Sequence, residues 1–291
     1  MAAYLYLDRI VVLLTILLQH PMLLTGQNTK IFGHRGCRGL LPENTIAAFN
    51  KAIELGVDGI EWDVVVNKDK ELIISHEAYI DKSYCKYFDG TYINNKSKKE
   101  LNIYNITSKD INKYDCGSIY KDKFPDQKLQ KSVKPSVKQA FNEVNFNNTT
   151  EILFEIKSSP VDYNIYQPEI KEYANIIYNE LVNNSRLEHV TFMSFDKNML
   201  NELIKLFPQN KYIYLIYNPL KPYKDIIGEL NFEPYALGIY YHIITDNTIK
   251  QAHNNDIKIY AWTVNNNKDA KKLISKGVDG IITDYPNLFI K

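Results

Sequence analysis

From residue 30 onward, short apolar segments alternate with longer amphipathic ones, and this alternation limits the choice of fold more than any other feature of the chain. Eight of the apolar segments are rich in β-branched and aromatic residues, which is typical of strands buried on both faces. These segments cover residues 31–33, 59–66, 152–156, 190–195, 212–217, 236–241, 257–264 and 278–282. We expect each of them to form one strand of a buried sheet.

Every expected strand but the last is followed by an amphipathic stretch that predicts a helix. Those stretches cover residues 44–55, 136–144, 169–182, 198–206, 221–230, 246–254 and 267–276. Asn44 or Thr45 is a candidate N-cap for the first helix, and Gly56 is a candidate stop. Alternating strands and helices imply parallel pairing through right-handed crossovers. Eight such units in 291 residues predict an α/β fold, a TIM (β/α)8 barrel, with an open doubly wound sheet as the alternative.

One further apolar run, residues 72–75, follows the second expected strand after the polar turn 67–70. This spacing predicts an antiparallel hairpin. If Val66 pairs near Glu71, the hairpin returns His76 to the neighbourhood of Glu61 and Asp63. The histidine would then lie beside two acidic residues without belonging to a barrel strand.

The pattern stops between residues 77 and 134, where the chain becomes polar and rich in Lys, Asn and Tyr. This segment is too long for a simple barrel loop, so we expect a small insertion over the C-terminal mouth of the barrel. It contains two of the three cysteines, Cys85 and Cys116, which we expect to form a disulfide that leaves Cys37 free. Three unpaired thiols are the alternative, and the lack of any CxxC pair argues against structural zinc.

The N-terminus differs from the rest, because Arg9 is followed by a mostly apolar run, residues 10–18, and by a second apolar patch, residues 22–24. A basic-flanked apolar run shorter than the roughly 20 residues of a membrane span predicts a secretory signal peptide. We therefore predict a signal at residues 1–26 and a single domain at 27–291, with the mature protein periplasmic, secreted or surface-associated and not stably inserted in a membrane. An uncleaved anchor or a buried N-terminal helix is the alternative reading.

Charged residues stand inside otherwise apolar strand segments, where an unpaired charge would cost several kcal/mol. Glu61 and Asp63 lie two apart and so share one face of a strand, as do Glu155 and Lys157. Three carboxylates at the C-terminal ends of neighbouring strands suit one hard divalent cation, Ca²⁺ or Mg²⁺. A metal-free salt-bridge network with Arg35 and Lys157 is the alternative.

Two histidines, His34 and His76, are expected beside these carboxylates, which suggests hydrolysis with general acid–base catalysis. Arg35 and Lys157 add positive charge for an anionic substrate, and an Arg offers a bidentate fork to phosphate oxygens. The whole chain has a formal charge of only +1, so no strong field favours nucleic acid, and any anion must be held locally. The combination indicates phosphate ester chemistry.

At these residues the sequence resembles the glycerophosphodiester phosphodiesterase family of TIM-barrel phosphodiesterases. The matching motifs are Gly33-His34-Arg35-Gly36, Pro42-Glu43-Asn44-Thr45 with Ala48-Phe49, residues 56–64, Ile74-Ser75-His76, Glu155-Ile156-Lys157, Trp262-Thr263-Val264-Asn265 and residues 279–286. They span residues 33–286 in the family's order. One departure is Glu77, where the family usually has Asp after the second histidine.

The resemblance implies hydrolysis of glycerophosphodiesters to an alcohol and sn-glycerol 3-phosphate by a metal-dependent enzyme that acts on a small molecule. It assigns the metal to Glu61, Asp63 and Glu155, acid–base catalysis to His34 and His76, and the phosphate to Arg35 and Lys157, in agreement with the roles argued from charge. Trp262 would form a wall for the glycerol or the leaving group, unless it is a core residue. Glu43 would orient the site from behind, unless it only begins a helix.

Three other functions compete with this reading. A phospholipase of the phosphatidylinositol-specific type also uses two histidines, but its bacterial form does not need three carboxylates around a metal. A non-catalytic phosphodiester-binding protein would be expected to lack a histidine or a carboxylate of the set. A surface-anchored lipid-binding protein would need an exposed amphipathic stretch beyond the N-terminal segment.

Overall fold

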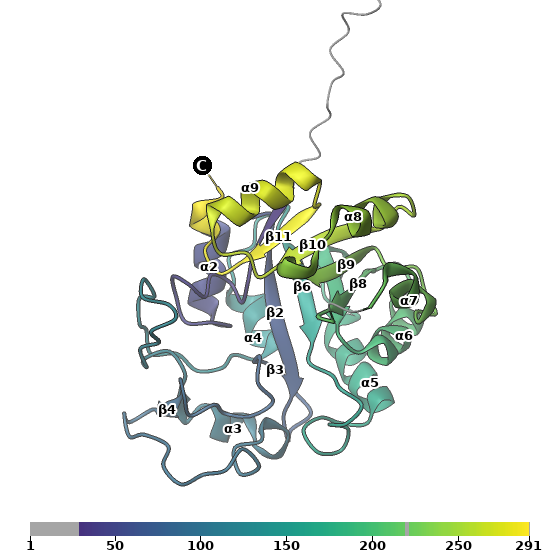
Figure 1. The fold of residues 1–291 in the computed structure, drawn as a ribbon. Coiled ribbons are helices and arrows are strands. Elements are labelled where there is room, and N and C mark those ends of the chain that lie inside the picture. The colour runs from purple at the N-terminus through teal and green to yellow at the C-terminus, as the bar shows by residue number, and fades with distance from the viewer. Residues whose placement is uncertain (1–28, 219–220, 291) are drawn as a thin grey trace, which may run out of the picture.

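The computed structural model describes residues 29–218 and 221–290, and its centre is a closed barrel of eight parallel strands (Figure 1). The barrel strands are β1 (Lys30–Gly33), β2 (Gly59–Val66), β6 (Glu151–Ile156), β7 (Val190–Ser194), β8 (Lys211–Ile216), β9 (Ala236–Tyr240), β10 (Lys258–Trp262) and β11 (Gly280–Thr283). β1 pairs with β11 on one side and with β2 on the other, which closes the sheet. The TIM barrel is therefore confirmed, and the open doubly wound sheet is excluded.

A helix follows each barrel strand except the last, and each lies within the stretch expected from the sequence except α6, which begins one residue earlier. The helices are α2 (Ile46–Leu55), α4 (Val137–Glu143), α5 (Ile170–Leu181), α6 (Lys197–Leu206), α7 (Tyr223–Gly228), α8 (Asp246–His253) and α9 (Asn267–Lys276). The Thr45 hydroxyl caps α2 by accepting from the Ala48 N–H, and Gly56 ends the helix at φ 91°, the left-handed region that favours glycine. Of the two candidate N-caps, Thr45 is the one used.

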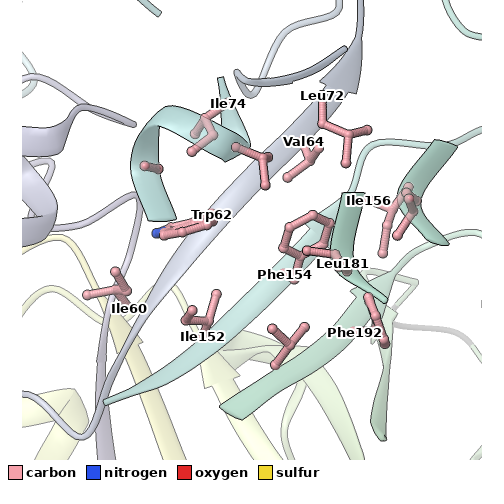
Figure 2. Close-up of a cluster of buried hydrophobic side chains, with 14 of the residues drawn as sticks. Ile60, Trp62, Val64, Leu72, Ile74, Ile152, Phe154, Ile156, Leu181 and Phe192 are labelled. Carbon is pink, nitrogen blue, oxygen red and sulfur yellow. The ribbon is translucent and has the colours of Figure 1, made fainter. Parts of the chain in front are cut away.

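The side chains of β2 divide strictly between the two faces of the barrel wall. Ile60, Trp62 and Val64 point outward into the layer between the sheet and the helices, where Figure 2 shows them with apolar residues of β6, α5 and their neighbours. Because side chains alternate along a strand, Glu61 and Asp63 must point into the barrel. The apolar packing of the outer face thereby fixes where the two carboxylates lie.

The hairpin that follows β2 has the expected register. β3 (Leu72–Ile74) runs antiparallel to β2, with Val66 opposite Leu72 and Val64 opposite Ile74. The Ser75 N–H then donates to the Asp63 carbonyl at 2.8 Å. His76 follows directly and is delivered to the acidic side chains by the hairpin.

The insertion contains β4 (Lys86–Tyr87), paired antiparallel with β5 (Tyr114–Asp115), together with α3 (Ser108–Ile111) and the 3-10 turn η1 (Ile103–Asn105). It lies beside the C-terminal end of β2 in Figure 1 and has its own buried cluster around Ile80 and Ile103. Cys85 and Cys116 form a disulfide and Cys37 is a free buried thiol, as predicted. The disulfide joins the residue just before β4 to the residue just after β5.

The predicted signal segment, residues 1–26, lies outside the described residues. Across 29–218 and 221–290, the helices are all too short or too polar to cross a bilayer.

Candidate active site

Three carboxylates from two neighbouring strands meet inside the barrel. Asp63 on β2 is directly opposite Glu155 on β6, and Glu61 precedes Asp63 on the same face. One oxygen from each of the three lies within 4.8 Å of the others, and all three residues are buried. The residues predicted to bind a metal are thus brought together by strand register alone.

The negative charge of this trio is only partly balanced by neighbouring groups. Glu61 Oε1 and Asp63 Oδ1 are buried without a hydrogen-bond partner. Burial, and then the charges of Asp63 and Glu155, raise the pKa of Glu61 well above its usual value. Unsatisfied carboxylate oxygens at this spacing fit one hard divalent cation. The donor set, all oxygen, therefore fits the predicted Ca²⁺ or Mg²⁺ better than a closed salt-bridge network.

Lys157 is the cation nearest to the trio. Its ammonium forms an ion pair with Glu155 and lies 3.2 Å from Asp63 Oδ1. Burial alone would lower the pKa of Lys157, but these two carboxylates outweigh it and raise that pKa. Lys157 therefore stays charged at the edge of the carboxylates.

Arg35 lies in a tight turn whose backbone conformation depends on Gly33 and Gly36. It has φ 51°, and Gly36 after it has φ 85°. A Cβ on Gly33 would come within 1.9 Å of the Gly36 carbonyl oxygen, so both glycines are required by the turn. The Arg35 N–H donates to Glu61 Oε2 at 2.6 Å, and its guanidinium donates to Glu43 Oε1 at 2.7 Å. Arg35, which is predicted to bind the substrate phosphate, is therefore hydrogen-bonded to both Glu61 and Glu43.

Asn44 holds Asp63 from the opposite side, a role that sequence reasoning missed because it treated Asn44 only as a candidate cap. It has φ 56°, which Asn tolerates better than most residues. Its amide nitrogen donates to Asp63 Oδ2 at 2.8 Å, and its backbone N–H donates to the Arg35 carbonyl at 3.0 Å. Burial alone would raise the pKa of Asp63, but the charges of Lys157 and Arg35 hold it well below its usual range.

His34 is oriented by a carboxylate from the other end of the chain. Its Nδ1 lies 2.7 Å from Asp284 Oδ1, and Asp284 directly follows β11. Burial, followed by the charge of Arg38, lowers the pKa of His34 to about 4. The ring is therefore neutral at neutral pH, with Nδ1 as the natural site of its proton and Nε2 left for another partner.

Asp284 accepts from several groups besides His34. Arg38 donates to its two oxygens from Nε at 2.8 Å and from a terminal nitrogen at 3.1 Å. Asn265 donates to Oδ2 at 2.7 Å. Burial alone would raise the pKa of Asp284, but His34 and Arg38 hold it well below its usual range. The carboxylate remains ionised and fixed.

His76 has an analogous arrangement. Its Nδ1 lies 2.7 Å from Glu77 Oε1, and this hydrogen bond lowers the pKa of Glu77. Glu77 thus supplies a carboxylate next to the second histidine, with one more methylene than the family's usual Asp. Both predicted histidines are held at Nδ1 by an acidic side chain.

These residues surround a cavity of about 390 Å³ at the barrel mouth, lined among others by His34, Arg35, His76, Lys157 and Trp262. A second cavity, of about 430 Å³, continues from it past His76 and Lys157. The Trp262 indole lies 5.6 Å from the rings of Phe195 and Tyr240 and 6.1 Å from that of Tyr217, measured between ring centroids. Trp262 therefore both packs in an aromatic cluster and faces the cavity.

Comparison with known proteins agrees with the fold and with the family that the sequence motifs resemble. The model of the Glycerophosphoryl diester phosphodiesterase family matches residues 34–288. This chain belongs to that family. A glycerophosphodiester phosphodiesterase of Caldanaerobacter subterraneus subsp. tengcongensis is 31% identical to it over 264 residues, which cover 90% of this chain and 96% of that protein.

Two solved structures share the barrel of this family member. One, from Silicibacter pomeroyi, has a TM-score of 0.80 at 24% identity and covers 89% of this chain and 91% of its own. The other is a phosphodiesterase of Oleispira antarctica in complex with the product sn-glycerol-3-phosphate, with a TM-score of 0.69 at 21% identity, covering 88% and 93%. At these identities the likeness concerns the fold.

All nine predicted site residues of this phosphodiesterase-family chain lie in or directly behind the cavity. Four further residues, to which the sequence assigned no role in the site, support them: Asn44, Lys121 and Asp284 contact predicted site residues directly, and Arg38 donates to Asp284. Asn44 and Asp284 belong to motifs that match the family, and those motifs could have indicated their roles in the site. Arg38 and Lys121 carry no such signal, because their partners are distant in sequence.

Proposed function

We propose that this chain hydrolyses glycerophosphodiesters to an alcohol and sn-glycerol 3-phosphate, with a divalent cation and two histidines as general acid and base. The observation that carries the proposal is that His34 and His76, each held at Nδ1 by a carboxylate, line one cavity with Glu155, which belongs to the cluster of three buried carboxylates. The product named for the Oleispira antarctica relative supports the same reaction.

In this proposal Glu61, Asp63 and Glu155 hold one Ca²⁺ or Mg²⁺. When bound, such a cation supplies positive charge that polarises a phosphoryl oxygen. Glu61 fits this role because its pKa is raised when only protein groups surround it, so a cation would replace the proton that it otherwise favours.

The two histidines divide the proton transfers between them. With Nδ1 engaged by Asp284 or Glu77, each ring presents Nε2 to the substrate. One neutral ring takes the proton of the attacking hydroxyl, which belongs to water or to the substrate's own glycerol 2-carbon. The other ring, protonated, gives its proton to the departing alcohol. If water attacks, the two rings return to their starting states by exchanging a proton with solvent. If the 2-hydroxyl attacks, a cyclic phosphate forms first; water then opens it to sn-glycerol 3-phosphate while the rings exchange roles.

Arg35 and Lys157 neutralise the phosphate in this scheme, and Trp262 borders the space for the glycerol or the leaving group. The guanidinium is already aligned by Glu43 and Asp63, so little side-chain entropy is lost when phosphate binds. Lys157 lies between the carboxylates and the second cavity, which places positive charge where the two cavities meet.

The test is a coupled assay for sn-glycerol 3-phosphate released from several glycerophosphodiesters, with and without EDTA. We expect release that EDTA abolishes and that Ca²⁺ or Mg²⁺ restores. Activity that is insensitive to the chelator would remove the cation from the proposal. Binding of the diesters with no release from any of them would favour a binding protein.

We also propose that the protein is exported. The Cys85–Cys116 disulfide supports this, because such bonds persist in oxidising compartments. Mass spectrometry of the protein from its native cell would test it: the disulfide should be intact and the first 26 or so residues removed. A full-length chain with three free thiols in the cytoplasmic fraction would refute export.

A further inference from the structure

The insertion reaches behind the site as well as beside it, at Glu43. This carboxylate is 8% exposed and is shared between two cations. Oε1 accepts from Arg35 at 2.7 Å, and Oε2 accepts from Lys121 of the insertion at 2.8 Å. Arg35 Nε also lies 3.2 Å from Asp63 Oδ2. Negative and positive side chains therefore alternate in successive ion pairs, in the order Asp63, Arg35, Glu43, Lys121.

Lys121 is itself held by the insertion. Its ammonium lies 3.8 Å from the centroid of the Tyr84 ring. The Tyr84 hydroxyl accepts from Lys134 at 3.2 Å, and that lysine is 7% exposed, so burial lowers its pKa to about 8. Tyr84 is next to Cys85, whose disulfide to Cys116 closes this part of the insertion. The ammonium of Lys121 therefore packs on the Tyr84 ring, which is held by the hydrogen bond from Lys134 and by the neighbouring disulfide.

Arg35 and Lys121 both favour the ionised form of Glu43 at this depth. Burial would raise its pKa, and Arg35 first and Lys121 second hold that pKa well below its usual range. Without Lys121, Oε2 would be buried with no partner, and the carboxylate could rotate or take up a proton. Either change would release the guanidinium of Arg35 from its fixed direction.

We propose that Lys121 is a positioning residue of the phosphate site: it fixes Glu43, which fixes the Arg35 guanidinium against the cavity. The insertion thereby completes the site and does not only cover it. The inference rests on the proposed function in one respect, that Arg35 binds the phosphate group.

The test compares Lys121→Met with Lys131→Met in the full-length protein. Lys131 is a matched control because its ammonium also packs on an aromatic ring of the insertion, 3.9 Å from the Phe88 centroid, and the carboxylate on which its charge acts is the exposed Asp89. We expect K121M to raise KM for the best glycerophosphodiester, and the Kd for inorganic phosphate, by about tenfold, the low end for a lost charged hydrogen bond. We expect K131M to change both by less than about twofold, and Lys121→Arg to restore most of the loss.

A smaller than twofold effect of K121M on both quantities, or an equal effect of K131M, would overturn the proposal. If K121M does not fold, Glu43→Gln and the double variant E43Q/K121M serve instead. The double variant should then weaken phosphate binding no more than E43Q alone, and additive losses would refute the chain from Lys121 to Arg35. Phosphate binding needs no turnover, so the variants can still be ranked if the wild-type chain hydrolyses no diester.

Discussion

Replacing Asp284 by Asn would test the electrostatic design of the site most directly. The wild-type Oδ1 accepts from His34 and from Arg38 Nε, and Oδ2 accepts from Arg38 and Asn265. An amide offers one oxygen and one NH₂ group. Whichever way it is turned, two donors must face another donor, and Arg38 loses its anionic partner.

The magnitude follows from this count. Removing one partner of a buried ion pair costs about 3–5 kcal/mol, and the Asp284 side chain is fully buried while that of Arg38 is 11% exposed. For a chain of this size, a loss of about 3 kcal/mol lowers the unfolding midpoint by roughly 6–12 °C. A misdirected His34 would lower kcat/KM by about 10²–10³-fold, the range for a displaced acid–base group.

The assay is steady-state release of sn-glycerol 3-phosphate together with thermal unfolding, and the chain provides its own control. Asp279 forms a similar pair with His253, at 2.9 Å, just before β11 and away from the cavity. Asp279→Asn should lower stability but leave kcat/KM within about threefold of wild type, as distant sites act independently. If D284N and D279N lost stability alike and D284N kept its activity, Asp284 would have no role in orienting His34.

Further predictions concern the carboxylates, the histidines and the disulfide. Because the pKa of Glu61 is raised, the contribution of Glu61 to the stability of the metal-free protein is lost as pH rises above about 4.5, the ordinary Glu value; in EDTA at pH 8, E61Q should therefore melt above wild type. Mg²⁺ or Ca²⁺ should stabilise wild type and not E61Q, and equal stabilisation of both would contradict the metal site. His34→Ala and His76→Ala should each reduce kcat/KM by at least about 10²-fold, so a loss below tenfold in either would remove that ring from the chemistry. Cys85→Ser with Cys116→Ser opens a link across 31 residues and should cost about 3–4 kcal/mol in denaturant unfolding, whereas an unchanged midpoint would mean that the link does not stabilise the fold.

The sequence predicted the barrel well because the signals were local. Each strand is a short apolar run, and its buried residues need only the strand period to be assigned to a face. The period placed Glu61 with Asp63 and Glu155 with Lys157, and the turn at 67–70 was enough to return His76. β2 and β6 are consecutive barrel strands and pair in parallel, so Asp63 and Glu155 near their C-terminal ends lie opposite each other.

The remaining parts of the site depend on contacts that no local pattern encodes. Asp284 reaches His34 across 250 residues, and Lys121 reaches Glu43 across 78. Such pairs exist only after the barrel has closed and the insertion has folded onto it. Asn44 was misread for a different reason: its neighbour Thr45 satisfied the cap, and the side chain of Asn44 was then free to bind Asp63.

The position of these distant residues has a common physical cause. A cluster of three carboxylates can be tolerated in the barrel only if positive charge lies near it, and Lys157, directly after β6, supplies one such charge at close range. Arg35 comes from the loop after β1, and it in turn needs Glu43 to hold its direction, which then needs Lys121. Each buried charge is thus paired with one nearer the surface, and the series ends at the partly exposed Lys121 of the insertion. The insertion, whose sequence carried no readable motif, therefore supplies Lys121, the outermost charge of the series that supports Arg35.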